Sequence, residues 1–423
     1  MTQALSADRG RIDDGGVLAL TGALAIYGLV YSHLATFLTS KAGVPSTPVN
    51  LAIFGLGLIL ASGIFVRRSL TRSSVGILVA VLAYVFILLG SLSFLGEQAF
   101  SLTRDRLVWA MVSSGAIILL SNLRSPTLFL LIVRVVILVS AMLVIAEFAS
   151  GFSLPVVMTT VPGRAAGLFE NPNIAALFIP MALPVVTIGL KPVHRMFWYA
   201  LTLTCVVLTF SRGGLALCAL AIVLVEAFPV QRAGVTSLRR LFILALLAVT
   251  AVSLYGLIST LLIENFGSEL DANTIRRARL EGNASSDIRL YVLRLAWDGF
   301  STSPFWGHGT GAGERWEVQD VSVHNMFGLV ALEYGVIGLT WLGGFLLALW
   351  SIPRPFGIWA ASLFTVASVT THNLADGSTY AAILATYAAL PALFTAPQGH
   401  GPTARSRSQS AGGRRLLGPT GHP

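Results

Sequence analysis

The sequence has little charge for its length. Only 11% of its 423 residues are charged, whereas soluble domains average about 25%. So few charged side chains cannot cover the surface of a globular protein of this size with polar groups. Together with 55% hydrophobic residues and a mean hydropathy of +0.77, this excludes an ordinary cytosolic enzyme and a nucleic-acid-binding module. The composition indicates a protein that is solvated by lipid.

Several common functional motifs are also absent from the sequence. Its two cysteines, Cys205 and Cys218, fall in apolar runs and offer neither a disulfide framework nor a metal-ligand spacing. There is no phosphate-binding lysine loop, no dinucleotide-binding glycine fingerprint and no Gly-x-Ser-x-Gly elbow. Few carboxylates lie deep in apolar runs, and the two halves of the chain are not alike, which argues against a proton-coupled transporter. The sequence therefore predicts no metal site and no cofactor.

What the sequence does contain is a series of long apolar runs. A membrane-spanning helix needs about 20 mostly apolar residues. Twelve runs meet or approach this length, and we predict an all-α polytopic membrane protein with about 12 transmembrane helices. The runs are Val17–Leu38, Val49–Val66, Val75–Leu95, Leu107–Ser121, Thr127–Phe148, Ile174–Leu190, Phe197–Phe210, Gly213–Phe228, Leu241–Ile263, His324–Trp350, Phe356–Thr371 and Thr379–Thr395.

Lysine and arginine between the runs predict the orientation. With the N-terminus inside, the inner segments carry sixteen of these residues, and the short outer loops carry five. The outer five are Lys41, Arg104, Arg106, Arg164 and Arg212. Because positive residues accumulate on the cytoplasmic side, we predict a multi-pass protein of the cytoplasmic (inner) membrane with both termini in the cytoplasm. The same bias explains the net charge of +9 without nucleic acid.

The predicted spans divide the chain into segments. We expect a cytoplasmic N-terminus (1–16), nine transmembrane helices (17–263), a large extracytoplasmic loop (264–323), three further transmembrane helices (324–395) and a disordered basic tail (396–423). The first 16 residues carry three Asp and two Arg, which is not the pattern of a cleavable signal peptide. Within the large loop, residues 287–300 place apolar side chains at helical spacing and predict an amphipathic helix on the outer membrane surface. Loops of this length are usually functional.

His324 stands at the predicted outer mouth of the tenth span. On a continuous helix, Gly328, Ala331, Gly335 and Gly338 would lie within about 40° of it. This stripe of small residues could serve close helix packing, or it could form a smooth groove for a lipid tail below a titratable base. Glu333 would lie on the opposite face, so we do not expect it to pair with His324.

Three arginines on the predicted outer side have distinctive surroundings. Arg164 lies in Pro-Gly-Arg-Ala-Ala-Gly, Arg212 lies in Ser-Arg-Gly-Gly, and Arg289 opens the amphipathic segment. Arginine binds phosphate through two parallel hydrogen bonds and keeps its charge. At membrane depth it costs about 2.5–3.5 kcal/mol, which suggests a purpose. The alternative for Arg212 is a charge that snorkels from a hairpin, and we expect Arg134 in the fifth span to snorkel as well.

Other polar residues leave two interpretations open. Asn171-Pro-Asn173 reads first as the start of a helix, with Asn as a cap, although these amides could also bind sugar hydroxyls. His372 and Asp376 occupy the last predicted outer loop. They could orient or supplement His324, or they could be a polar loop with a helix cap.

Four segments in this order resemble the O-antigen ligase family. His324-Asn325, nine residues, then Gly335-Val336-Ile337-Gly338 resembles the family signature of His, then Asn, Ser or Gln, nine residues, and Gly-x-x-Gly. Arg289 followed by Pro304-Phe305-Trp306-Gly307-His308-Gly309 resembles the approach to it, with Leu293 where the family often has Trp, and Trp297 close by but out of register. Phe210-Ser211-Arg212-Gly213-Gly214 and Gly167-Leu168-Phe169-Glu170-Asn171-Pro172-Asn173 resemble two further family segments. The likeness covers roughly residues 160–340.

The resemblance implies a glycosyltransferase that takes its glycan from a polyprenyl-diphosphate-linked donor at the outer face of the cytoplasmic membrane. The acceptor would be a lipid, a protein or a growing polysaccharide, and the enzyme either a ligase or a repeat-unit polymerase. His324 would be the general base, and Arg212 and Arg289, supported by Arg164, would bind the diphosphate in place of a metal. Asn171, Asn173, Asn325, Gly335, Gly338, His372 and Asp376 would contact substrate. The alternative from another class is a transporter of lipid-linked glycans.

Overall fold

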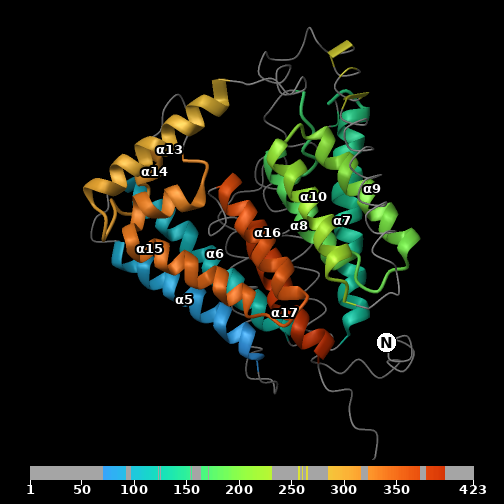
Figure 1. Ribbon diagram of the computed structural model, residues 1–423, viewed down its shortest axis with the longest axis horizontal. Coiled ribbons are helices and arrows are strands. Elements are labelled where there is room, and N and C mark those ends of the chain that lie inside the picture. The colour runs from blue at the N-terminus through green and yellow to red at the C-terminus, as the bar shows by residue number, and fades with distance from the viewer. Residues whose placement is uncertain are drawn as a thin grey trace, which may run out of the picture.

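The computed structural model describes residues 70–91, 97–121, 123, 125–152, 154, 163–169, 171–230, 284–315, 323–371 and 378–395, with a few positions between 256 and 264. Every element assigned in these residues is a helix (Figure 1). The helices are α5 (Arg72–Ser91), α6 (Glu97–Ser121), α7 (Pro126–Ala149), α8 (Pro172–Val186), α9 (Pro192–Leu208), α10 (Arg212–Ala227), α13 (Ala284–Thr302), α14 (Ala312–Arg315), α15 (Met326–Trp350), α16 (Phe356–Thr370) and α17 (Ser378–Thr395).

The predicted all-α class is confirmed for the described residues, and most predicted runs coincide with helices. Three helices, α5, α7 and α15, are long and apolar enough to cross a membrane, and Pro172–Val186, Phe356–Thr370 and Tyr380–Phe394 are shorter apolar helices. Helix α13 covers the predicted amphipathic segment. The first two runs, almost all of the ninth, the basic tail, His372 and Asp376 lie outside the described residues, so the count of twelve spans and the orientation stay predictions.

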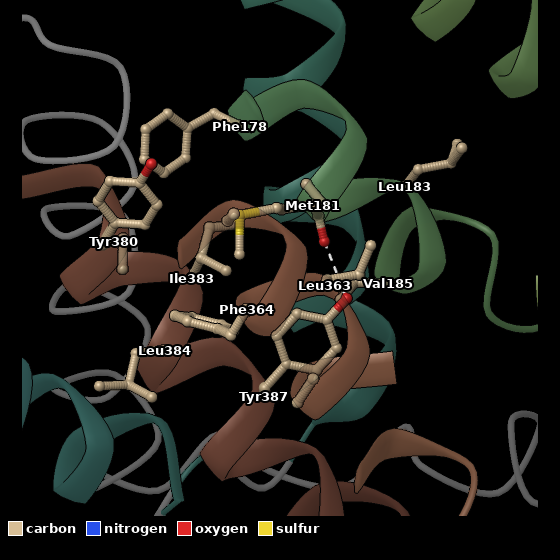
Figure 2. Close-up of a cluster of buried hydrophobic side chains, with 14 of the residues drawn as sticks. Phe178, Met181, Leu183, Val185, Leu363, Phe364, Tyr380, Ile383, Leu384 and Tyr387 are labelled. Carbon is tan, nitrogen blue, oxygen red and sulfur yellow. Dashed lines mark hydrogen bonds between the residues drawn. The ribbon is translucent and has the colours of Figure 1, made fainter. Parts of the chain in front are cut away.

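The helices form two groups that meet at α16 and α17 (Figure 1). Helices α5, α6, α13, α14 and α15 lie on one side, and α7–α10 lie on the other. Helix α16 packs against both α15 and α10, and α17 packs against both α6 and α8. Figure 2 shows the packing at α8, where the Tyr387 hydroxyl donates to the Met181 carbonyl over 2.8 Å and the Tyr380 ring lies 4.5 Å from that of Phe178. The two C-terminal helices therefore join the two groups.

Helix α6 is longer than the sequence predicted. We expected the fourth span to begin at Leu107, with Arg104 and Arg106 in an outer loop, but the helix begins at Glu97 and contains both arginines. Arg106 is only 5% exposed. Its guanidinium forms an ion pair with Glu333 of α15 and donates to the Tyr334 hydroxyl over 2.7 Å. The prediction was wrong because a partner distant in sequence compensates the charge that ended the apolar run.

Helix α15 is broken at Gly335, so the tenth span is not the continuous helix that we predicted. Gly335 has φ 62° and ψ −148°, a conformation that glycine adopts without steric cost. The freed Val336 amide donates to the Pro304 carbonyl over 2.7 Å. A Cβ at Gly335 would lie 2.5 Å from that same oxygen. The small-residue stripe therefore cannot continue along one face from His324 to Gly338, because these residues lie on opposite sides of the break.

Candidate active site

The C-terminal turn of α16 brings two distant candidate segments together. The Asn325 side-chain amide donates to the Val369 carbonyl over 3.2 Å. A Cβ at Gly213 would lie 3.2 Å from the Thr370 Cγ2 atom, which is a close packing contact. The residues next to these contacts in sequence are His324 and Arg212. The predicted base and a predicted phosphate-binding arginine therefore flank the same end of α16, on the α15 side and the α10 side.

Arg212 is the first residue of α10. Ser211 caps this helix, its hydroxyl accepting from the Gly214 amide over 3.3 Å. A Cβ at Gly214 would lie 2.5 Å from the Ala176 Cβ, so α10 packs directly on α8. Arg212 itself is exposed, and the helix N-terminus beside it carries a partial positive charge. This combination favours an anion.

Arg289 lies at the same end of its helix pair as His324. Leu293, one turn after Arg289, packs on Gly328, one turn after His324, because a Cβ at Gly328 would lie 2.6 Å from the Leu293 Cδ1 atom. Further along, the chain after α13 reaches Gly335 at Pro304. The helix α13 and the first half of α15 therefore run in the same direction, with Arg289 and His324, both half-buried, at their start.

Leu293 stands where the resembled family often has tryptophan, and its contact with α15 suits a leucine side chain. Leu293 fills the space above Gly328, whereas Trp297 is 64% exposed. Among the ring contacts of the described residues, Trp297 has one with Phe300, and the two ring centroids lie 5.2 Å apart. The contact of Leu293 with Gly328 and the buried cluster of Val292, Ala296, Leu329 and Leu332 together hold α13 on α15.

Asn325 is the cap of α15. Its Oδ1 atom accepts from the Gly328 amide over 3.0 Å, while its Nδ2 atom holds α16 as described above. Both ends of this side chain are used to join two helices, and His324 precedes it directly. Asn325 thereby fixes the backbone next to the histidine, and a contact between Asn325 and substrate stays a prediction.

Arg164 is buried, and its guanidinium contacts protein groups. It is 2% exposed, its Nε donates to the Thr209 carbonyl over 2.7 Å, and its Nη2 donates to the Asn173 Oδ1 atom over 2.8 Å. Asn171 caps α8, as the helix-start interpretation predicted, with its Oδ1 accepting from the Asn173 amide over 2.8 Å. The role of these three residues toward a substrate stays a prediction.

The two glycines of the Gly-x-x-Gly signature are covered by protein. The backbone of Pro304 and Phe305 lies on Gly335, and a Cβ at Gly338 would lie 2.6 Å from the Val330 Cγ1 atom. Gly335 therefore packs on the chain after α13, and Gly338 packs on residues of α15 itself. Substrate contact at Gly335 and Gly338 remains a prediction.

Sequence reasoning missed the polar cluster around Glu333. Besides its ion pair with Arg106, this buried carboxylate accepts from the Gly311 amide over 2.8 Å. The Tyr334 hydroxyl hydrogen-bonds to Thr310, which in turn hydrogen-bonds to Ser91. The helical wheel did indicate that Glu333 faces away from His324, but no pattern in the sequence identifies a partner more than two hundred residues upstream.

Two further charged residues of the spans are held by backbone groups. Arg134 is the residue that we expected to snorkel. Its guanidinium donates to the Val186 and Ile188 carbonyls at the end of α8, over 2.9 and 2.6 Å. Glu147 of α7, which the sequence did not single out, accepts from two amides, as described below. In the part of the chain that the structure describes, no three His, Cys, Asp or Glu side chains gather as a metal site would require.

Comparison with protein families gives a match over part of the chain. Residues 197–343 match the family model described as O-antigen ligase. This range contains Arg212, Arg289 and the His324–Gly338 segment. A search of curated proteins found no match.

Proposed function

We propose, from the match of residues 197–343 to the O-antigen ligase family model, that the protein transfers a glycan from a polyprenyl-diphosphate donor to an acceptor hydroxyl on the outer face of the cytoplasmic membrane. The observation that supports this most is the junction at the end of α16. There, Asn325 and Gly213 contact neighbouring residues, Val369 and Thr370. A base and a permanent cation beside one helix end are the two groups that this transfer needs.

The donor's diphosphate is the leaving group in this proposal. As the bond between the anomeric carbon and the diphosphate oxygen breaks, negative charge grows on the diphosphate. Arg212 and Arg289 would bind it, assisted by the partial positive charge at the start of α10. Fixed positive groups aimed at developing charge stabilise the transition state. Arginine suits this task because it stays charged and offers a planar pair of donors.

His324 is the general base of the proposal. The acceptor oxygen forms the new bond to the anomeric carbon, and its proton passes to the neutral imidazole of His324. General-base assistance of this kind contributes about 10²–10⁴-fold in rate. The cap formed by Asn325 would hold the imidazole at the same level as Arg289, so that proton removal and leaving-group stabilisation occur in one place.

The test is chemical release of the leaving group. Purified protein in lipid nanodiscs would receive a polyprenyl-diphosphate glycan and candidate acceptors, and polyprenyl diphosphate should appear only with an acceptor. Proteoliposomes that move intact donor across the bilayer without release would establish the transporter instead. Products from repeat units alone would identify a polymerase, and products only with a foreign lipid or protein acceptor would identify a ligase.

Sidedness requires a separate measurement. A cysteine at Ser286 should react with an impermeant thiol reagent added outside intact cells, whereas a cysteine at Ser408 should not. The native Cys205 and Cys218 are buried and give little background. Labelling of the Ser408 variant would place the site on the wrong side for an extracytoplasmic donor.

A further inference from the structure

A buried carboxylate in α7 holds the loop that carries Arg164. Glu147 has no exposed surface, although it lies in the last turn of a strongly apolar helix. Its Oε2 atom accepts from the Ala166 and Gly167 amides, both over 2.6 Å. Burying such a group is costly unless it is hydrogen-bonded. The two bonds therefore tie the loop of residues 163–169 firmly to α7.

The loop backbone itself lies on α7 one turn before Glu147. Gly167 has φ 63°, and a Cβ there would lie 3.1 Å from the Val144 amide nitrogen. A residue with a side chain would need both a strained backbone and a shift of the helix. The carboxylate and the glycine together hold this loop against α7.

From that placement, the loop reaches the turn between α9 and α10. Arg164 Nε donates to the Thr209 carbonyl, and the Ala165 amide donates to the Leu208 carbonyl over 3.2 Å. The turn includes Phe210 at φ 49°, an unfavourable conformation for a residue with a side chain. Such a conformation persists when surrounding contacts impose it. Arg212 follows two residues later.

We propose that Glu147 and Arg164 are positioning residues that fix the turn before Arg212, and that neither touches the donor. Glu147 acts through the loop backbone, and Arg164 acts through the Thr209 carbonyl and Asn173. The inference rests on the proposed function only in assuming that Arg212 binds the donor's diphosphate. The mechanical part, that these two side chains hold residues 209–214, stands on the contacts alone.

The first test is hydrogen exchange of the α9–α10 turn, measured by mass spectrometry on the full-length protein in nanodiscs. Glu147→Ala and Arg164→Lys should each speed exchange at residues 209–214 by about tenfold. Arg164→Lys weakens the bonds to the turn directly, and Glu147→Ala releases the loop that carries Arg164. Lysine can reach one acceptor but lacks the planar fork for two. If Glu147→Ala fails to insert, Arg164→Lys carries the test. Unchanged exchange in the variants that insert would overturn the proposal.

The matched control is Glu226→Ala. Glu226 is also a buried carboxylate between α9 and α10, but it lies at the other end of α10, where it accepts from the Tyr199 hydroxyl over 2.6 Å and from Arg195 over 3.2 Å. Its loss should lower thermal stability without changing exchange at residues 209–214. If the control and Glu147→Ala exchanged equally fast at residues 209–214, Glu147 would contribute only to general stability.

Activity distinguishes this proposal from the proposed function. Glu147→Ala and Arg164→Lys should lower kcat/KM for the donor by about ten- to a hundredfold, as small displacements of substrate-binding groups do. Glu147→Gln should stay close to the parent, since its amide oxygen can accept both bonds and the other carboxylate oxygen has no hydrogen bond within the described residues. A parent without transferase activity but with the expected exchange pattern would refute the function and leave the positioning role supported. Lost activity with normal exchange would instead indicate direct donor contact.

Discussion

Asn325 offers the sharpest test of the junction at α16, because one side chain makes two separable bonds. Its Oδ1 atom caps α15 through the Gly328 amide, and its Nδ2 atom binds the Val369 carbonyl. Asn325→Asp keeps the cap, and the new carboxylate also suits a helix N-terminus. It loses the bond to Val369, however, and places an oxygen against that carbonyl.

The size of the effect follows from these two bonds. Losing the Val369 bond, which is exposed, should cost about 0.5–1.5 kcal/mol, or about two- to 13-fold in the population of the closed junction. Asn325→Ala also loses the cap, which costs about 0.5–2 kcal/mol more. We therefore expect donor turnover to fall in the order parent, Asp variant, Ala variant, measured as polyprenyl diphosphate release under saturating acceptor.

A cap at the opposite end of the bundle is the control. Ser125 caps α7 through the Leu128 amide over 3.3 Å, so Ser125→Ala loses a comparable cap far from the junction. It should lower thermal stability and leave turnover close to the parent. Full activity in Asn325→Asp, or an equal loss in Ser125→Ala, would refute the idea that the α15–α16 bond places His324.

Three further outcomes are expected. His324→Gln and His324→Ala should insert normally and lose about 10²–10⁴-fold in transfer rate; retained activity in the Gln variant would show that the histidine only orients substrate. Arg212→Lys should be folded and strongly impaired, because it keeps the charge without the planar fork, and near-normal turnover would reduce Arg212 to a snorkelling charge. Glu333→Ala should destabilise the protein by about 3–5 kcal/mol, because it leaves Arg106 without its buried counter-ion, and the thermal midpoint should fall. Partial recovery of the midpoint in the double variant with Arg106→Met would confirm that the two residues are coupled. Independent effects of the two substitutions would contradict it.

The sequence alone determined which segments form most of the described helices. A run of apolar residues predicts a helix without reference to the rest of the chain, and the sequence also predicted that Asn171 and Pro172 mark a helix start, as they do for α8. These are local interactions within one turn. The candidate segments could be identified in the same way, because their motifs are contiguous.

Only the tertiary structure decided which of these residues meet and what each contacts. Arg106 looked like a loop charge until Glu333 compensated it inside the bundle. Gly335 looked like one member of a stripe until the Pro304 backbone broke the helix there. The sequence placed Arg164 beside a predicted phosphate site, and only the structure shows that its guanidinium donates to Thr209 and Asn173. Hydropathy scores each residue against lipid, and the energy of a buried charge or a helix break depends on a distant partner that supplies the missing hydrogen bond.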